Sequence, residues 1–366
     1  MFHIPAMQER PPQKSHRTPG RAALSNPDVR FDRLRRETVD DGWWPEDALP
    51  VLRTEVREEV ARTIISRNTS PDLSFDRSIN PYRGCEHGCI YCFARPSHAF
   101  LGHSPGLDFD TKLIAKPNAA DLLRKELSKP GYQPATIAIG TNTDAYQPVE
   151  KSRGIMRDVL GVLSEFNHPV GIVTKGTLIA RDIDILAPMA AQGLVRVGVS
   201  VTTLDPAVSR AMEPRVPSPA ARLRLIRQLT DAGIAVRVMV SPVIPALTDH
   251  EVEAILQAAK DAGAVAASSI VLRLPREVAG LFRDWVEENY PDRAARIMGR
   301  VRELHGGQDY DPAFGKRMTG QGEWAAMMRQ RFTLAARRLG LDRTLPPLRT
   351  DLFAVPPAVG DQLSMF

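Results

Sequence analysis

Residues 85–92 read Cys85-Glu-His-Gly-Cys89-Ile-Tyr-Cys92, and this stretch contains all three cysteines of the 366-residue chain. The C-x3-C-x2-C spacing offers three thiolates, which bind three irons of a [4Fe–4S] cube where full ligation by protein would need four. The fourth iron is then open, and an open position is how a metal site receives a substrate or cofactor. A zinc site completed by His87 or His98 is the alternative for the same cysteines.

The composition is that of an ordinary globular protein, with 43% hydrophobic and 25% charged residues. The sequence contains no run of about 18 apolar residues, so it predicts no membrane span. The polar N-terminus lacks the apolar segment of a signal peptide. An odd number of cysteines without a secretory signal argues against disulfides. We therefore expect a cytoplasmic protein, in the reducing environment that an exposed cluster needs.

Apolar strands alternate with amphipathic helices after the cysteine motif. Strands are expected at residues 78–82, 136–140, 170–174, 194–201, 235–240 and 269–273, and helices at residues 118–128, 152–166, 220–232 and 250–262. This βα alternation predicts an α/β fold with a parallel sheet. From Arg276 onward the alternation stops, and residues 281–290 and 324–339 are typical of helices.

The cysteine motif resembles that of the radical S-adenosylmethionine superfamily, with an aromatic residue before the third cysteine and a strand-like segment ahead of the first. Four further segments resemble the branch that contains spore photoproduct lyase: Asn80–Cys85, Cys92–Arg95, Gly140–Glu150 and Glu213–Arg215. The resemblance implies a partial (β/α)6 TIM-like barrel, with its active site at the C-terminal ends of the strands.

The expected domains follow from this. An N-terminal arm and lead-in cover residues 1–65, with a disordered arm to about residue 30, a charged helix at residues 30–41 and a short helix or strand at 55–65. The barrel covers residues 66–275. A basic helical extension covers residues 276–350, and a tail covers residues 351–366.

The resemblance also implies two cofactors, a [4Fe–4S] cluster and S-adenosylmethionine (SAM), whose amino and carboxylate groups chelate the open iron. An electron from a donor such as flavodoxin or ferredoxin would cleave SAM, and the 5′-deoxyadenosyl radical would take a hydrogen atom from the substrate. The substrate hypothesis is DNA or another nucleic acid, for repair or modification. A peptide or small-molecule substrate is the alternative, and a non-catalytic iron–sulfur docking module is a third hypothesis.

Polar residues at the expected strand ends suit the parts of SAM. The resemblance assigns Tyr91 to the adenine wall. Asn142 or Asp144 takes the methionine amino group, because the usual Gly-Gly-Glu is absent here. Lys175 suits the methionine carboxylate as a point charge, and Ser200 suits the ribose.

Two further residues complete the expected site. Glu213, in the loop after the fourth strand, is expected to face the barrel mouth as part of the cofactor site. Lyases of the resembling branch use a cysteine near the end of the second strand as a hydrogen-atom donor, and this chain has no cysteine outside the motif. Tyr146 is the candidate catalytic replacement.

The C-terminus suggests partners. It reads Gln362-Leu-Ser-Met-Phe366, which resembles the QLSLF-type peptide that docks bacterial DNA-processing proteins on the sliding clamp, behind a Pro356-Pro357 linker. Between Arg273 and Arg349 there are 15 Lys and Arg against 10 Asp and Glu, an excess as large as the net charge of the whole chain, +5. This segment is either a solvated helical surface or a face that meets a phosphate backbone.

Overall fold

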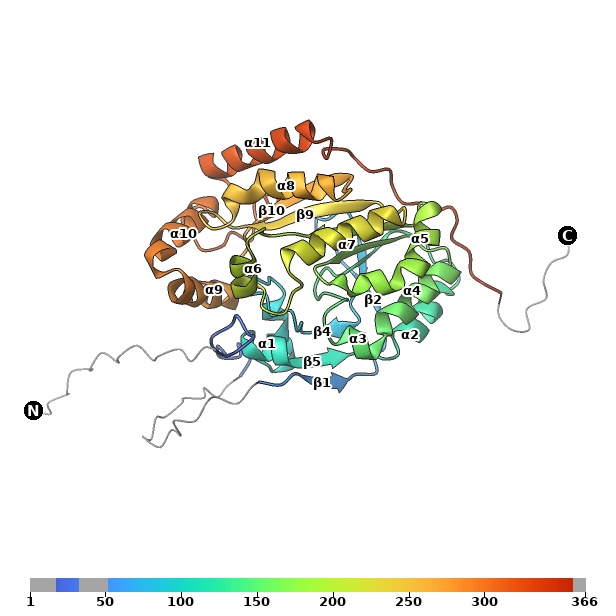
Figure 1. Ribbon diagram of the computed structural model, residues 1–366. Helices are drawn as coiled ribbons and strands as arrows, with labels where there is room; N and C mark the ends of the chain where they lie inside the picture. Colours follow the sequence, from blue (N-terminus) through green and yellow to red (C-terminus); the bar gives the residue numbers. More distant parts are fainter. Residues whose placement is uncertain (1–17, 33–51, 358–366) are drawn as a thin grey trace, which may run out of the picture.

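A largely parallel sheet forms the centre of the molecule (Figure 1). The computed structural model describes residues 18–32 and 52–357. The strand order in the sheet is β10-β9-β8-β7-β6-β3-β2. The strands are β2 (Ile65–Arg67), β3 (Arg77–Ile79), β6 (Ile137–Ile139), β7 (Val170–Thr174), β8 (Val195–Ser200), β9 (Val236–Val243) and β10 (Ala266–Val271). All neighbours from β3 to β10 run parallel, and β2 pairs antiparallel with β3.

Helices connect the parallel strands and cover the sheet (Figure 1). They are α2 (Ala119–Leu127), α3 (Glu150–Arg153), α4 (Ile155–Glu165), η2 (Thr177–Asp182), α5 (Ile183–Ala191), α6 (Pro206–Met212), α7 (Pro219–Asp231), η3 (Asp249–Glu251) and α8 (Val252–Asp261). The structure therefore confirms a mixed α/β fold with a parallel sheet. Because its strands run parallel, their C-terminal ends lie along one edge of the sheet.

Local sequence explains where these helices begin and end. Ser218 caps α7 by accepting a hydrogen bond from the Ala221 amide, and Pro219 occupies the first turn. Gly154 separates α3 from α4 with a φ of +69°, a conformation that favours glycine. The sequence predicted one helix over residues 152–166, and the structure divides it at this glycine.

A smaller sheet lies beside the first strand of the main one. It pairs β1 (Glu55–Glu58), β5 (Lys112–Ala115) and β4 (Tyr82–Arg83) in the order β1-β5-β4. The sequence predicted a single strand over residues 78–82, but β3 ends at Ile79 and the chain leaves the main sheet before β4. Pro81 lies between the two strands, and proline cannot donate a ladder hydrogen bond.

Residues 18–32 pack against the body, which corrects the prediction of a disordered arm to about residue 30. Ala22 and Ala23 are buried, and the Arg21 guanidinium donates to the Asp110 carbonyl oxygen at 3.0 Å. This contact places the segment against α1 (Leu107–Thr111), and the Arg30 guanidinium donates to the Pro96 carbonyl oxygen in η1 (Arg95–Leu101). Nearly all of the charged helix expected at residues 30–41 lies outside the described residues.

The C-terminal part is helical, as the sequence predicted. It consists of α9 (Glu277–Asn289), α10 (Pro291–Leu304) and α11 (Gly322–Arg338), and α11 lies over α8 (Figure 1). The chain then runs back to the N-terminal ends of the strands. There the Arg349 amide donates to the Gly193 carbonyl and the Ala354 amide donates to the Phe166 carbonyl. Within residues 18–32 and 52–357, every helix is too short or too polar to span a lipid bilayer.

Candidate active site

The three cysteines lie in a tight loop between β4 and η1. Gly84 and Gly88 have φ angles of +77° and +65°, which favour glycine. A Cβ on Gly84 would lie 2.8 Å from Leu113, so a larger residue would push the loop off the small sheet. The glycines therefore let the backbone turn closely enough for all three thiols to face one side.

Two buried side chains hold this loop in shape. The Arg95 guanidinium donates to the carbonyl oxygens of Gly88 and Cys89, and it forms a fully buried ion pair with Asp110 at 3.0 Å. Gln147 accepts from the Glu86 amide and donates to the Gly84 carbonyl. Arg95 and Gln147 belong to segments that resemble the spore photoproduct lyase branch, and the structure gives both a role in fixing the cysteine loop.

The cysteines face a cavity of about 920 Å³, counting its open mouth. The C-terminal ends of β6 to β10 form the other walls. In parallel sheets of this kind, catalytic and ligand-binding residues lie at these strand ends. Its polar wall comes from β6, β7 and β8 and includes Thr141, Asn142, Asp144, Thr174, Lys175 and Ser200. Burial raises the pKa of each of the three thiols, so their thiolates need a metal to stabilise them.

Asp144 joins the ends of β6 and β7. Its carboxylate accepts from the Lys175 amide at 2.7 Å and from the Thr174 hydroxyl at 2.6 Å, and it lies 3.3 Å from Nδ1 of His87. Burial alone would raise the pKa of Asp144, but His87 and these hydrogen bonds hold it well below its usual value. Since both carboxylate oxygens are already engaged, Asp144 fits a structural role better than contact with the methionine amino group.

Asn142 is the remaining candidate for the methionine amino group. It lines the cavity, and its amide has no hydrogen-bond partner within the described part of the chain. Gly140 makes this strand end possible, because a Cβ there would lie 1.9 Å from the Val173 carbonyl oxygen on β7. Ser200, at the end of β8, also lines the cavity, as the ribose hypothesis requires.

Lys175 and Glu213 belong to one buried charge network. Glu213 accepts from the Tyr91 hydroxyl and the Thr202 hydroxyl, and it pairs with the fully buried Arg222 at 2.8 Å. Burial alone would lower the pKa of Lys175, but Cys89 and the carboxylates of Glu213 and Asp144 raise it, which keeps the ammonium charged. Burial alone would raise the pKa of Glu213, but Arg222 and Lys175 lower it.

Of the two predicted residues in this network, Tyr91 lies at the cavity and Glu213 does not. Tyr91 lines the cavity, and the Lys175 ammonium lies 5.7 Å from its ring centroid. Glu213 does not line the cavity and lies behind Tyr91, so it acts on the site through Tyr91 and Lys175. Two residues on, Arg215 pairs with Glu86 at 2.9 Å, so the segment Glu213–Arg215 contacts the cysteine loop at both ends.

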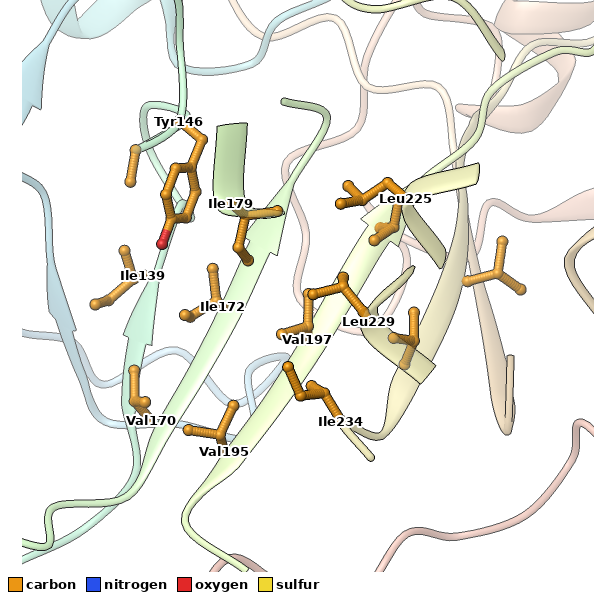
Figure 2. Packing of buried hydrophobic residues seen from close by; sticks show 14 of the residues in the cluster. Ile139, Tyr146, Val170, Ile172, Ile179, Val195, Val197, Leu225, Leu229 and Ile234 are labelled. Carbon is orange, nitrogen blue, oxygen red and sulfur yellow. The ribbon is translucent and has the colours of Figure 1, made fainter. Parts of the chain in front are cut away.

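Tyr146 is not at the cavity, which corrects the hypothesis that it replaces the missing cysteine. Its ring lies in the hydrophobic core with Ile139, Ile172 and Ile179 (Figure 2). Its hydroxyl donates to Asp182 at 3.2 Å. The Tyr146 amide also donates to the Asp144 carboxylate at 2.9 Å.

The ends of β9 and β10 form a further wall of the cavity. It contains Met239, Ser241, Pro242, Ile270, Val271 and Arg273, and Phe93, the residue after Cys92, also lines the cavity. The sequence predicted the last strand at residues 269–273, whereas β10 ends at Val271. Arg273 therefore lies just beyond the strand end, the position at which side chains reach the mouth of such sites.

These residues fit a [4Fe–4S] cluster. The thiols of Cys85, Cys89 and Cys92 all line one cavity, and each thiolate of a cube binds a different iron. Of the two candidate zinc ligands, His87 contacts Asp144, and His98 is buried away from the cavity lining.

Comparisons with known proteins agree with this site. The profile of the Radical SAM superfamily matches residues 79–259. An uncharacterized protein of Mycobacterium tuberculosis is 38% identical over 288 residues, which cover 78% of this chain and 81% of that protein. An uncharacterized protein of Methanocaldococcus jannaschii is 27% identical over 215 residues, covering 58% of this chain and 76% of that protein.

Among solved structures, spore photoproduct lyase complexed with dinucleoside spore photoproduct matches with a TM-score of 0.56 at 15% identity. The match covers 78% of this chain and 79% of that one, and at this identity it shows a shared fold. A variant of the same lyase was solved with bound AdoMet. The chain belongs to the radical SAM superfamily, a class of enzymes that use a [4Fe–4S] cluster and SAM.

Proposed function

We propose that the parallel strands β3 to β10 form a partial (β/α)6 barrel whose mouth is the cavity, and that SAM binds there next to a cluster on Cys85, Cys89 and Cys92. The observation that carries this proposal is the shared cavity, which brings the cysteine loop together with Asn142 and Lys175. When bound, the two cofactors supply reductive cleavage of SAM and a 5′-deoxyadenosyl radical that abstracts hydrogen from a substrate.

The side chains would each act on one part of SAM. The Lys175 ammonium would bind the methionine carboxylate, and the Asn142 amide would accept from the methionine amino group. Ser200 would bind the ribose, and the Tyr91 ring would contact the adenine. Glu213 would act as a positioning residue, because it fixes the Tyr91 hydroxyl and balances the charge of Lys175.

The test is anaerobic. The protein would be reconstituted with iron and sulfide, reduced with dithionite and mixed with SAM, and 5′-deoxyadenosine would be measured by chromatography. We expect the nucleoside from the wild-type protein and none from Cys89→Ala. Failure of the wild-type protein, with a full and reducible cluster and a range of substrates, would refute the proposal.

For the substrate, we propose a nucleic acid that undergoes repair or modification. The support is the likeness to the branch of spore photoproduct lyase and the net charge of +5. Dimer splitting itself is not part of the proposal, because no cysteine remains as hydrogen donor and Tyr146 lies in the core. Hydrogen abstraction from a peptide, with no binding of nucleic acid, would favour the alternative substrate class.

Partners and location follow from the same chemistry. The enzyme needs a reductant, for which we propose a flavodoxin or ferredoxin in a reducing cytoplasm. Residues 362–366, the proposed clamp-binding peptide, lie outside the described residues. The described chain before them runs past Gly193 and Phe166, at the end of the sheet remote from the cavity. Deletion of residues 362–366 should abolish co-elution with a bacterial sliding clamp, and unchanged co-elution would refute this partner.

A further inference from the structure

The last strand end and the cysteine loop form a cation–aromatic pair at the cavity. We propose that Arg273 and Phe93 are the substrate-recognition residues, with Arg273 binding a phosphate of a nucleic-acid strand and Phe93 stacking on the adjacent base. The guanidinium carbon of Arg273 lies 4.9 Å from the centroid of the Phe93 ring, and both residues line the cavity. This inference rests on the proposed function and assigns the substrate class to two residues.

The positive charge of Arg273 is not balanced by a carboxylate among the described residues. Its Nη2 makes a long hydrogen bond of 3.4 Å to the Tyr310 hydroxyl, and its buried Nε has no hydrogen-bond partner. No carboxylate in residues 18–32 or 52–357 lies within ion-pairing distance of it. The nearby Asp72 carboxylate already pairs with Arg317 at 2.6 Å. Because a buried donor without a partner is costly, an anion bound to this guanidinium would be stabilised.

The other cation at the cavity differs in this respect. Lys175 lies among Cys89, Glu213 and Asp144, which balance its charge and suit it to the cofactor. Many arginines of the C-terminal extension are also paired with carboxylates, among them Arg283, Arg300, Arg302 and Arg331. These arginines do not line the cavity, and Arg273 is the cation that the cavity offers to a substrate.

Phe93 supplies the second half of the site. Although it follows Cys92 directly, its side chain remains 44% exposed, which is unusual for a phenylalanine at the edge of a buried loop. A ring with one face on a guanidinium and the rest open can stack on a nucleobase, and stacking tolerates any base. The guanidinium binds phosphate bidentately. A nucleotide, which carries a phosphate next to a planar base, therefore matches both the Arg273 guanidinium and the Phe93 ring.

The experiment measures binding of a fluorescent single-stranded DNA oligonucleotide to the reconstituted holoenzyme by anisotropy at several salt concentrations. Arg273→Met keeps much of the side-chain length and removes the charge. It should weaken binding roughly 10-fold or more and lower the salt-dependence slope by about 0.7. Arg273→Lys should keep the slope, and Phe93→Leu should weaken binding about 5-fold or more with the slope unchanged.

Arg124→Met is the matched control. Arg124 lies 5.7 Å from the Phe166 ring centroid and pairs with Glu165, but it is at the remote end of the sheet and Phe166 is buried. This variant should bind DNA as the wild type does. If Arg273→Met binds DNA as tightly as Arg124→Met does, the inference is wrong while the proposed function stands.

Two other outcomes would also overturn the inference. A wild-type enzyme that forms 5′-deoxyadenosine but binds no nucleic acid would remove the proposed substrate class and this site with it. The second outcome concerns the affinity for SAM, which is measured in parallel. If Arg273→Met loses as much affinity for SAM as for DNA, Arg273 belongs to the cofactor site instead.

Discussion

The two ends of the parallel sheet use buried polar groups in different ways. At the C-terminal ends, Glu213 and Arg222 are buried as an ion pair, and the half-buried Lys175 lies beside them at the cavity. At the N-terminal ends, His168 is buried as a neutral ring between Tyr132 and Phe353. Both ends are formed by the same repeated βα unit, so the difference comes from the side chains that each end carries.

The difference has a physical reason. Buried charges are costly unless each has a partner, so a network of them is retained where charge is needed for function. The aromatic cluster around Phe353 instead holds the last described segment, through ring contacts with Tyr132, Phe166 and His168. We therefore expect changes at the first end to affect both cofactor chemistry and stability, and changes at the second to affect stability alone.

The largest effect is expected for Glu213→Ala. It leaves Arg222 buried without its carboxylate, which should lower the free energy of unfolding by about 3–5 kcal/mol. It also releases the Tyr91 hydroxyl, so 5′-deoxyadenosine formation should fall as well. Chemical denaturation and the anaerobic assay measure the two effects.

The control for this prediction is an exposed pair. Glu303→Ala removes the partner of Arg300, whose ion pair is about half exposed, and should cost less than about 1 kcal/mol. If Glu213→Ala does not fold, Glu213→Gln keeps the side-chain shape without the charge. Equal stability and activity of the Glu213 and Glu303 variants would contradict the role of the network.

A pH effect of intermediate size is expected at the other end. The Nδ1–H of His168 donates to the Pro169 carbonyl, so its Nε2 accepts from the Tyr132 hydroxyl. Burial lowers the pKa of His168 from 6.5 to about 4. As the pH falls through this range, the unfolded chain takes up a proton that the folded one does not, so unfolding becomes more favourable. The loss should approach about 3 kcal/mol near pH 4.

His168→Gln tests this assignment. The variant should show a shallower decline of unfolding free energy between about pH 6.5 and about pH 4 than the wild type. Its 5′-deoxyadenosine formation at neutral pH should be unchanged, because His168 lies at the remote end of the sheet. Parallel pH curves for the two proteins would show that the imidazole does not remain neutral in the fold.

The sequence predicted the buried strands better than the connections between them. Residues 170–174 were expected as a strand, and β7 has the same bounds, because an apolar run between turn residues admits few alternatives. The small sheet β1-β5-β4 was missed, since it pairs short segments far apart in the sequence that show no periodicity. The helix α10 was also missed, next to the boundary at Pro291.

The site was predicted where the motif fixes the backbone. Cys85, Cys89, Tyr91 and Cys92 lie in one loop, so their spacing alone brings them together. Arg273 was missed because the sequence predicted that the last strand ends at this residue. In the structure β10 ends two residues earlier, at Val271, and Arg273 lies just beyond the strand end. Asp144 lay at the expected strand end, but only the structure reveals the four groups that already occupy its carboxylate.

Tyr146 gives the smallest expected effect and the sharpest contrast with the cavity. Tyr146→Phe removes one hydrogen bond to Asp182, which keeps its contacts with Arg157 and Arg181, so the loss of stability should be about 1 kcal/mol. Since the hydroxyl points into the core among Ile139, Ile172 and Ile179, formation of 5′-deoxyadenosine and of any substrate-derived product should be unchanged (Figure 2). If the variant still cleaves SAM but stops forming product, the loop after β6 must turn this ring toward the cysteines during the reaction. Tyr146 would then be the hydrogen donor after all.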